Sequence, residues 1–201
     1  PNDTPEFKGT FNGQNHSITN RYVSSETNPY NNSIAGVRSY YTVGFFGSTS
    51  SAVIKNLIIK GNVVTKENQY CGTIGFLVGS ASNTNFELIQ SDVNMEIGYN
   101  ISTDLEIGGV VGRGSGSVFN KIKVTGTINT LKGQGGIASS QIGKCGGVCG
   151  SASSVNECEV DMTIHINTQG SGSTQYIGGC CGSATVTDAI FTGILEVHDS
   201  W

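Results

Sequence analysis

Charged residues are scarce in this sequence. Asp, Glu, Lys and Arg make up 13% of its 201 residues, about half the usual share, which excludes a charged helical bundle. The net charge is −4 and the basic residues are scattered along the chain, so the sequence predicts no nucleic-acid partner. No run of about eighteen apolar residues occurs, which predicts no membrane insertion. The chain begins at Pro1 without a signal-peptide pattern, as is typical of a mature, processed or excerpted chain.

Familiar catalytic motifs are also missing. There is no G-x-S-x-G nucleophile elbow for a hydrolase serine. The string GQGGIA at 133–138 matches G-x-G-x-x-A, but the residues after it cannot open the helix that would bind pyrophosphate. We interpret this segment as a loop insertion. The histidines fall in different repeats without the spacing of a metal site, and we interpret His165 as a solvated residue on the outer face of a strand; the three are His16, His165 and His198.

Glycine, in contrast, is abundant, with 29 residues, about twice the average. Short glycine-rich stretches recur, and the last glycine of each stretch marks a repeat. The spacings between these markers are 32, 33, 38 and 32 residues, and each marker precedes a small polar turn and an alternating strand. The markers are Gly47, Gly79, Gly112, Gly150 and Gly182.

The segments after the markers alternate apolar and polar residues, as in Cys158, Val160, Met162 and Ile164. This period of two predicts strands with one buried face, and no apolar stripe of helical spacing persists over three turns. A repeat of this length with several strands and no helix favours a solenoid over a propeller. We therefore predict a single all-β domain over residues 1–201. It would be a right-handed parallel β-helix of about six coils, with an opening coil at 1–39.

The stretches GGVVG, GGVCG and GGCCG, each followed by a polar turn and a strand, resemble the GLUG-type repeats of large secreted and surface-attached proteins. The opening segment FKGTFNGQNHSITN, Phe7 to Asn20, is similar to the coil that often begins such arrays. The resemblance covers roughly Phe7 to Val197. It implies a parallel β-helix and an extracellular or cell-surface location, in agreement with the periodicity.

Counting back from each marker glycine predicts which residues stack in columns. One position back gives Phe46, Val78, Val111, Cys149 and Cys181, so the two cysteines would lie in adjacent coils within disulfide reach. Five back gives Thr42, Ile74, Ile107, Cys145 and Ile177. Two back gives an apolar column that alternation directs outward, as an interface for another subunit or for the N-terminal segment. Its members are Phe45, Leu77, Val110, Val148 and Cys180. The alternative is that the glycine pair bends the strand and turns this column into the core.

Six cysteines in a secreted chain favour disulfides over buried thiols, and both over a metal site. Fifteen pairings are possible, and the sequence does not choose among them. The candidates are Cys71, Cys145, Cys149, Cys158, Cys180 and Cys181. N-x-S/T acceptors, which predict N-glycosylation if the source is eukaryotic, occur at Asn2, Asn15, Asn31 and Asn100.

Acidic residues do not align between repeats as an active site would require. Asp92, Asp161 and Asp188 have different offsets from their markers, whereas Asp161 shares the offset of Lys123 and predicts a surface ion pair. We therefore expect no enzyme activity, catalytic residue, cofactor or metal, and a polysaccharide lyase or glycosidase ranks last.

The leading hypothesis is an extracellular structural module. It would assemble with copies of itself, end to end or by strand exchange, or form part of a long fibrous surface protein. The alternative is an adhesin that binds carbohydrate, such as surface glycans, or a host, with aromatic residues as the sugar platform. Those residues are Tyr30, Tyr40, Tyr41, Phe45 and Phe46.

Overall fold

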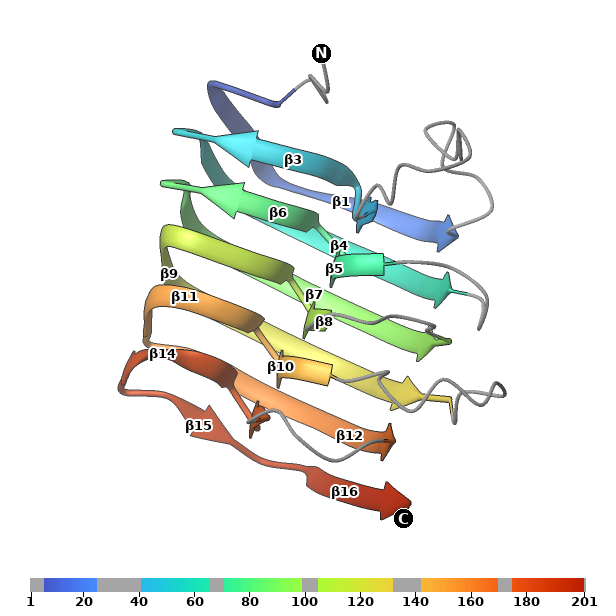
Figure 1. Ribbon diagram of the computed structural model, residues 1–201. Helices are drawn as coiled ribbons and strands as arrows, with labels where there is room; N and C mark the ends of the chain where they lie inside the picture. Colours follow the sequence, from blue (N-terminus) through green and yellow to red (C-terminus); the bar gives the residue numbers. More distant parts are fainter. Residues whose placement is uncertain are drawn as a thin grey trace.

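The computed structural model describes residues 6–24, 41–65, 71–98, 105–131, 142–169 and 175–200. These residues form an all-β parallel β-solenoid of about four turns, in which each turn stacks on the one before it (Figure 1). The parallel β-solenoid expected from the glycine spacing is therefore confirmed. Its right-handed sense, the count of six coils and the single domain over residues 1–201 stay predictions.

Two parallel sheets run along the solenoid. The smaller sheet holds five short strands: β2 (Tyr41–Val43), β5 (Cys71–Gly75), β8 (Leu105–Gly108), β10 (Ile142–Gly146) and β13 (Tyr176–Gly178). The larger sheet holds β1 (Thr10–Ser24), β3 (Phe46–Ser50), β4 (Val53–Thr65), β6 (Val78–Ser82), β7 (Asn85–Ile97), β9 (Val111–Thr130), β11 (Cys149–Asn156), β12 (Glu159–Gln169), β14 (Cys181–Thr187), β15 (Ile190–Phe191) and β16 (Ile194–Ser200). A typical turn passes from a short strand through a bend into the larger sheet, as β5, β6 and β7 do.

The register of the strands places like residues above one another. Phe46, Val78, Val111, Cys149 and Cys181 pair in succession, which confirms the column predicted from the marker glycines. The second column is correct from Ile74 through Ile107 and Cys145 to Ile177. Its first member is wrong, because Val43 and not Thr42 pairs with Ile74.

The core lies between the sheets and consists of the inward residues of each turn. Phe86 and Phe119 stack with ring centroids 4.6 Å apart and planes at 10°, and both are fully buried. Thr49, Thr84 and Ser117 carry a hydrogen-bonded chain through the interior, with 3.1 Å between the two threonine hydroxyls and 3.1 Å from the Thr84 amide to the Ser117 hydroxyl. Buried polar groups are costly unless they are bonded in this way.

The apolar column two residues before each marker faces the core in the middle turns. Leu77, Val110 and Val148 are fully buried, so the outward direction is wrong for them and the alternative, in which the bend turns this column into the core, is confirmed. Each lies in the bend between the two sheets, where the chain changes direction and strand alternation no longer applies. Phe45 and Cys180, in the first and last such bends, are partly buried against the same core.

One corner of the larger sheet recurs along the solenoid, and each time it contains a residue in the left-handed conformation. These residues have φ between 49° and 55°, and they are Asn56, Leu88, Lys121, Glu157 and Asp188. Only glycine and, less often, Asn or Asp adopt this conformation readily. The repeated geometry therefore belongs to the coil and not to any one side chain.

In another column of stacked residues, every second turn contributes a glycine. Gly61 pairs with Val93, which pairs with Gly126, which pairs with Met162. Added Cβ atoms at Gly61, Gly126 and Gly193 would collide with the carbonyl oxygens of Arg21, Val93 and Met162, respectively. Close approach of adjacent backbones thus alternates with larger side chains, and the packing repeats every two coils.

Candidate functional site

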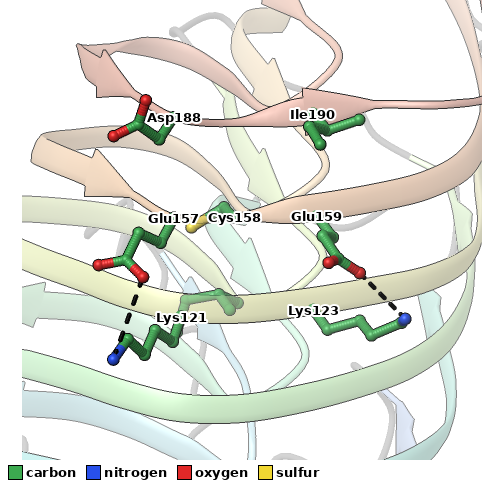
Figure 2. A pocket seen from close by; sticks show the side chains of 8 residues that line it. Lys121, Lys123, Glu157, Cys158, Glu159, Asp188 and Ile190 are labelled. Carbon is green, nitrogen blue, oxygen red and sulfur yellow. Dashed lines mark hydrogen bonds and ion pairs between the residues drawn. The ribbon is translucent and has the colours of Figure 1, made fainter.

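An open groove of about 470 Å³ follows the corner between β9, β12 and β15 (Figure 2). The left-handed residues Lys121, Glu157 and Asp188 lie along one side. Ion pairs join successive turns, with 4.0 Å between Lys121 Nζ and Glu157 Oε2 and 3.0 Å between Lys123 Nζ and Glu159 Oε2. The carboxylate of Asp188 makes no ion pair with any residue that the structure describes.

The chemistry of this groove is that of paired surface charges. Its one thiol, Cys158, is shielded from solvent, and this burial raises the pKa of Cys158 to about 11. Its sulfhydryl donates a 3.1 Å hydrogen bond to the Asn156 carbonyl oxygen. At neutral pH the thiol is therefore protonated and not an activated nucleophile.

Two sequence predictions about this face are wrong. Lys123 pairs with Glu159 in register, while Asp161 lies beside Thr125, so the expected pair of Asp161 and Lys123 does not form. Asp92 also lies beside Thr125, from the other side. Asp92 and Asp161 therefore share one column two turns apart, so the prediction that these two acidic residues do not align is wrong as well. The cause is that the number of residues between the marker glycine and the corner differs among turns.

The cysteines of the last turns gather along the core. Cys149 Sγ and Cys181 Sγ lie 3.1 Å apart on directly paired residues. Burial raises the pKa of Cys145 to about 12 and also raises the pKa of Cys149 and Cys180. The hydrogen bond from Cys149 lowers the pKa of the Cys181 thiol, assisted by the charge of Lys144. Formation of a disulfide by any of these cysteines stays a prediction.

A buried carboxylate connects the two sheets near these thiols. Glu106 on β8 is 5% exposed and accepts a 3.0 Å hydrogen bond from Arg113 Nε and another from the Ser151 hydroxyl. Lys144 Nζ lies 3.9 Å from the same carboxylate. The network satisfies a charge that would be costly if it were buried alone.

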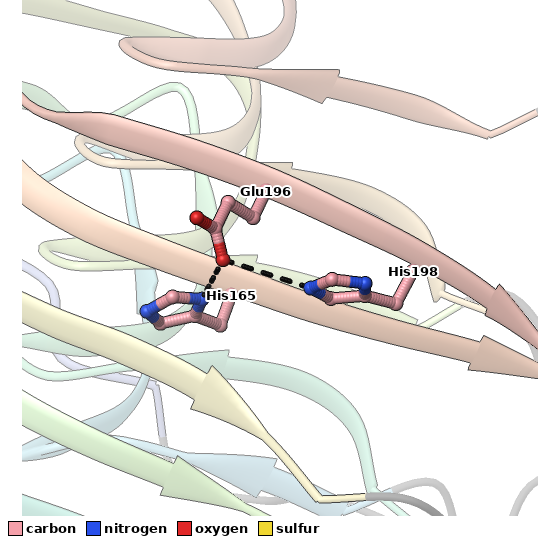
Figure 3. Close-up of side chains that lie close together, drawn as sticks. All are labelled: His165, Glu196 and His198. Atoms are coloured by element: carbon pink, nitrogen blue, oxygen red, sulfur yellow. Dashed lines mark ion pairs between the residues drawn. The ribbon is translucent and has the colours of Figure 1, made fainter.

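Two histidines and a glutamate, which the sequence reasoning missed, meet on the outer face of the last two turns (Figure 3). Glu196 Oε2 lies 2.8 Å from His165 Nδ1 and 3.6 Å from His198 Nε2. The register pairs His165 with Glu196, and residues 196 and 198 share one face of β16 by strand alternation. A search that compared histidines only with each other could not find this cluster, although aligning β12 with β16 would have shown it.

Large apolar side chains are exposed at the end of the solenoid that β13–β16 form. Among the described residues, six of the eight exposed large hydrophobics lie on this last coil: Tyr176, Val186, Ile190, Ile194, Leu195 and Val197. Leu195 and Val197 pair with the buried Ile164 and Ile166, so they continue the core columns to the uncovered end. We call the uncovered side of β13–β16 the terminal face.

The remaining predicted sites are only partly described. Asn15 is exposed on β1, whereas Asn2, Asn31 and Asn100 lie outside the described residues, as do Tyr30, Tyr40 and the segment 133–138. The side chains of Tyr41 and Cys71 are likewise not described. Phe45 and Phe46 pack edge to face at 5.0 Å, and Phe46 also contacts Phe7 and Phe11, which assigns them to packing.

Comparison with known proteins gave no relative. A scan against models of protein families, a search of curated proteins and a search of solved structures each found no match. The fold class is thus shown by the structure, while the similarity to GLUG-type repeats stays a prediction about family. No helix long and apolar enough to cross a membrane occurs in the described ranges.

Proposed function

We propose that this chain is an extracellular or cell-surface structural module that assembles head to tail with copies of itself. The observation that carries the proposal is the terminal face. Val186, Leu195 and Val197 continue core columns to this face and are exposed there, and exposed apolar patches on soluble proteins commonly bind a partner. In the described part of the chain, β16 pairs only with β12, so its other edge offers unpaired backbone groups to a further strand.

A second copy suits this face because the two ends of the solenoid match in register. Tyr22 on β1 and Ile194 on β16 are 53% and 52% exposed, and they are the first and last members of one outward column. The members between them are polar: Asn62, Asn94, Thr127 and Thr163. Stacking β1 of one copy under β16 of another would bring Tyr22 and Ile194 together and cover both.

Inward columns agree with this arrangement. Phe11 and Val186 begin and end one core column, while Ile18 and Phe191 begin and end another. Head-to-tail stacking would therefore place apolar residues on apolar residues. The alternation of glycines with larger residues would also continue across the junction. Within the chain, Val93 follows Gly61 and Met162 follows Gly126. At the junction, Arg21 of the next copy would follow Gly193 in the same way.

The test is to measure the assembly of the 201-residue chain by sedimentation and electron microscopy. We expect concentration-dependent filaments for the unmodified chain. Ile194→Glu and Tyr22→Lys should each weaken association about 10- to 100-fold, since a charge would be buried against an apolar side chain. Leu88→Glu is the matched control, because Leu88 is 45% exposed in a middle turn and should leave assembly unchanged.

Mixing the two variants tests the register itself. In the mixture, junctions that pair the introduced carboxylate with the introduced ammonium would alternate with unmodified junctions. The mixture should therefore polymerise at concentrations at which neither variant alone does. A monomeric unmodified chain at all concentrations would refute the proposal. Assembly without rescue in the mixture would refute the head-to-tail register.

A further inference from the structure

We propose that His165, Glu196 and His198 form a zinc site that fastens the last strand to the turn before it. The inference does not depend on assembly, because all three residues belong to one chain. Within the described ranges, these residues are the one group of three His, Cys, Asp or Glu side chains whose ligand atoms all lie within 4.8 Å of one another.

The strand pairing fixes where these side chains lie. His165 projects from β12 and the other two project from β16, and Figure 3 shows both imidazoles turned toward the Glu196 carboxylate. Glu196 occupies the centre, 2.8 Å from one imidazole nitrogen and 3.6 Å from the other. A single ion at this point would therefore bridge two neighbouring strands.

The spacing suits a tetrahedral ion after small side-chain rotations. With bonds of about 2.0–2.1 Å to nitrogen and oxygen, tetrahedral geometry separates two ligand atoms by roughly 3.4 Å. The 3.6 Å separation already matches this value, and the 2.8 Å pair must open by about half an ångström. No backbone movement is needed, because the three side chains are partly or largely exposed.

The donor set selects the metal. Two imidazoles and one carboxylate favour Zn²⁺ and related transition ions, whereas Ca²⁺ and Mg²⁺ prefer sites made of oxygen atoms. Three protein ligands leave one position of a tetrahedral ion to water. The exposed position of the side chains gives the ion direct access from solvent.

The consequence is a conditional fastening of β16. This strand has one paired edge in the described structure, and terminal elements of this kind open most readily. An ion that binds only when β16 is paired with β12 stabilises that pairing by mass action. At free zinc about 100 times the dissociation constant, hydrogen exchange of the β16 amides should slow about 100-fold.

Titration calorimetry with ZnCl₂ tests the site, using the Tyr22→Lys background so that assembly does not contribute heat. We expect one ion per chain, and a loss of at least about tenfold in affinity for Glu196→Gln, His165→Gln and His198→Gln. His16→Gln is the matched control, since His16 is exposed on β1 at the other end, and it should change nothing. MgCl₂ and CaCl₂ should give no heat of binding.

Cysteines are the competing zinc ligands, and Co²⁺ distinguishes them. The proposed site should give the visible bands of a tetrahedral nitrogen and oxygen complex without a thiolate charge-transfer band. A thiolate band, or binding that survives all three ligand substitutions, would overturn the proposal. Unchanged β16 exchange at saturating zinc would overturn the fastening role. If the chain does not assemble but binds zinc as described, the proposed function is refuted and the zinc site is still supported.

Discussion

At the scale of single residues, the cysteines of the last turns differ sharply although they lie close together. Cys180 and Cys181 are adjacent in sequence and both are partly buried. Burial raises the pKa of Cys180, whereas the hydrogen bond from Cys149 lowers the pKa of Cys181. A thiol reacts as its thiolate. Neighbouring cysteines are therefore expected to have unlike reactivity.

We predict that iodoacetamide at neutral pH modifies Cys181 before Cys180, the internal control, while the buried Cys145 and Cys158 are protected. Peptide mass mapping over time checks the order. Reaction of Cys180 ahead of Cys181 would contradict it.

With oxidised glutathione, the Cys181 thiolate should displace one glutathione, and Cys149, once its buried thiol loses its proton, should then displace the second. The products would be a Cys149–Cys181 disulfide and two reduced glutathiones.

At the scale of elements, the left-handed corner is the feature that recurs most regularly. Leu88 occupies it at φ 55°, where Asn56 stands in an earlier turn at φ 53°. A bulky side chain pays a conformational penalty of about 1–2 kcal/mol in this region, and Asn pays less. The corner is thus held by the stacking of neighbouring turns and not by the local preference of Leu88.

We predict that Leu88→Asn raises the free energy of unfolding by about 1 kcal/mol. The reverse change, Asn56→Leu, should lower it by at least a similar amount, because it also removes the 3.0 Å hydrogen bond from Asn56 Nδ2 to Asn12 Oδ1. Urea unfolding of both variants beside the unmodified chain provides the measurement. Equal stability of all three proteins would mean that side-chain identity does not matter at this corner.

The same elements show how much of the fold could be predicted from the sequence. The marker glycines predicted the parallel solenoid and the column from Phe46 to Cys181, because strand pairing repeats a fixed spacing. They left open whether Leu77 and its equivalents point outward or turn inward, since the bend lies between two strands. Alternation is a property of extended strands, and it gives no direction at a bend.

The candidate site was harder to predict for a related reason. Lys123 meets Glu159, and His165 meets Glu196, through alignments that depend on how many residues separate the marker glycine from the corner of each turn. The segment from marker to corner is nine residues long after Gly112 but seven after Gly150, so counting from the markers aligned Asp161 with the wrong partner. Contacts between turns can be predicted from the sequence only when residues are counted from the left-handed corner of each turn.

At the scale of the whole molecule, buried thiols connect stability to pH. Burial raises the pKa of Cys145 to about 12 and that of Cys158 to about 11, from an ordinary value of 9.0. Unfolded thiols ionise near the ordinary value, whereas the folded thiols stay protonated. The stability contribution is therefore complete below about pH 9 and is lost as the pH rises toward 11 and 12.

We predict that the free energy of unfolding falls steadily above about pH 9, and that Cys145 alone accounts for a loss of roughly 4 kcal/mol once the pH exceeds its folded pKa of about 12. Cys145→Ala should lower stability at neutral pH through the cavity that it leaves, but it should also flatten the alkaline slope. Cys181→Ala is the control, because the lowered pKa of Cys181 cannot produce this slope. Urea midpoints measured across the alkaline range decide the matter, and an unchanged slope in Cys145→Ala would contradict the assignment.

The alternation of Gly61, Val93, Gly126, Met162 and Gly193 also sets a rule for changes in length. Excising one coil would bring two glycines, or two larger side chains, face to face and spoil the fit between backbones. Excising a pair would restore the original neighbours. Duplication or loss of chain segments in this protein is therefore compatible with the packing only in even numbers of coils.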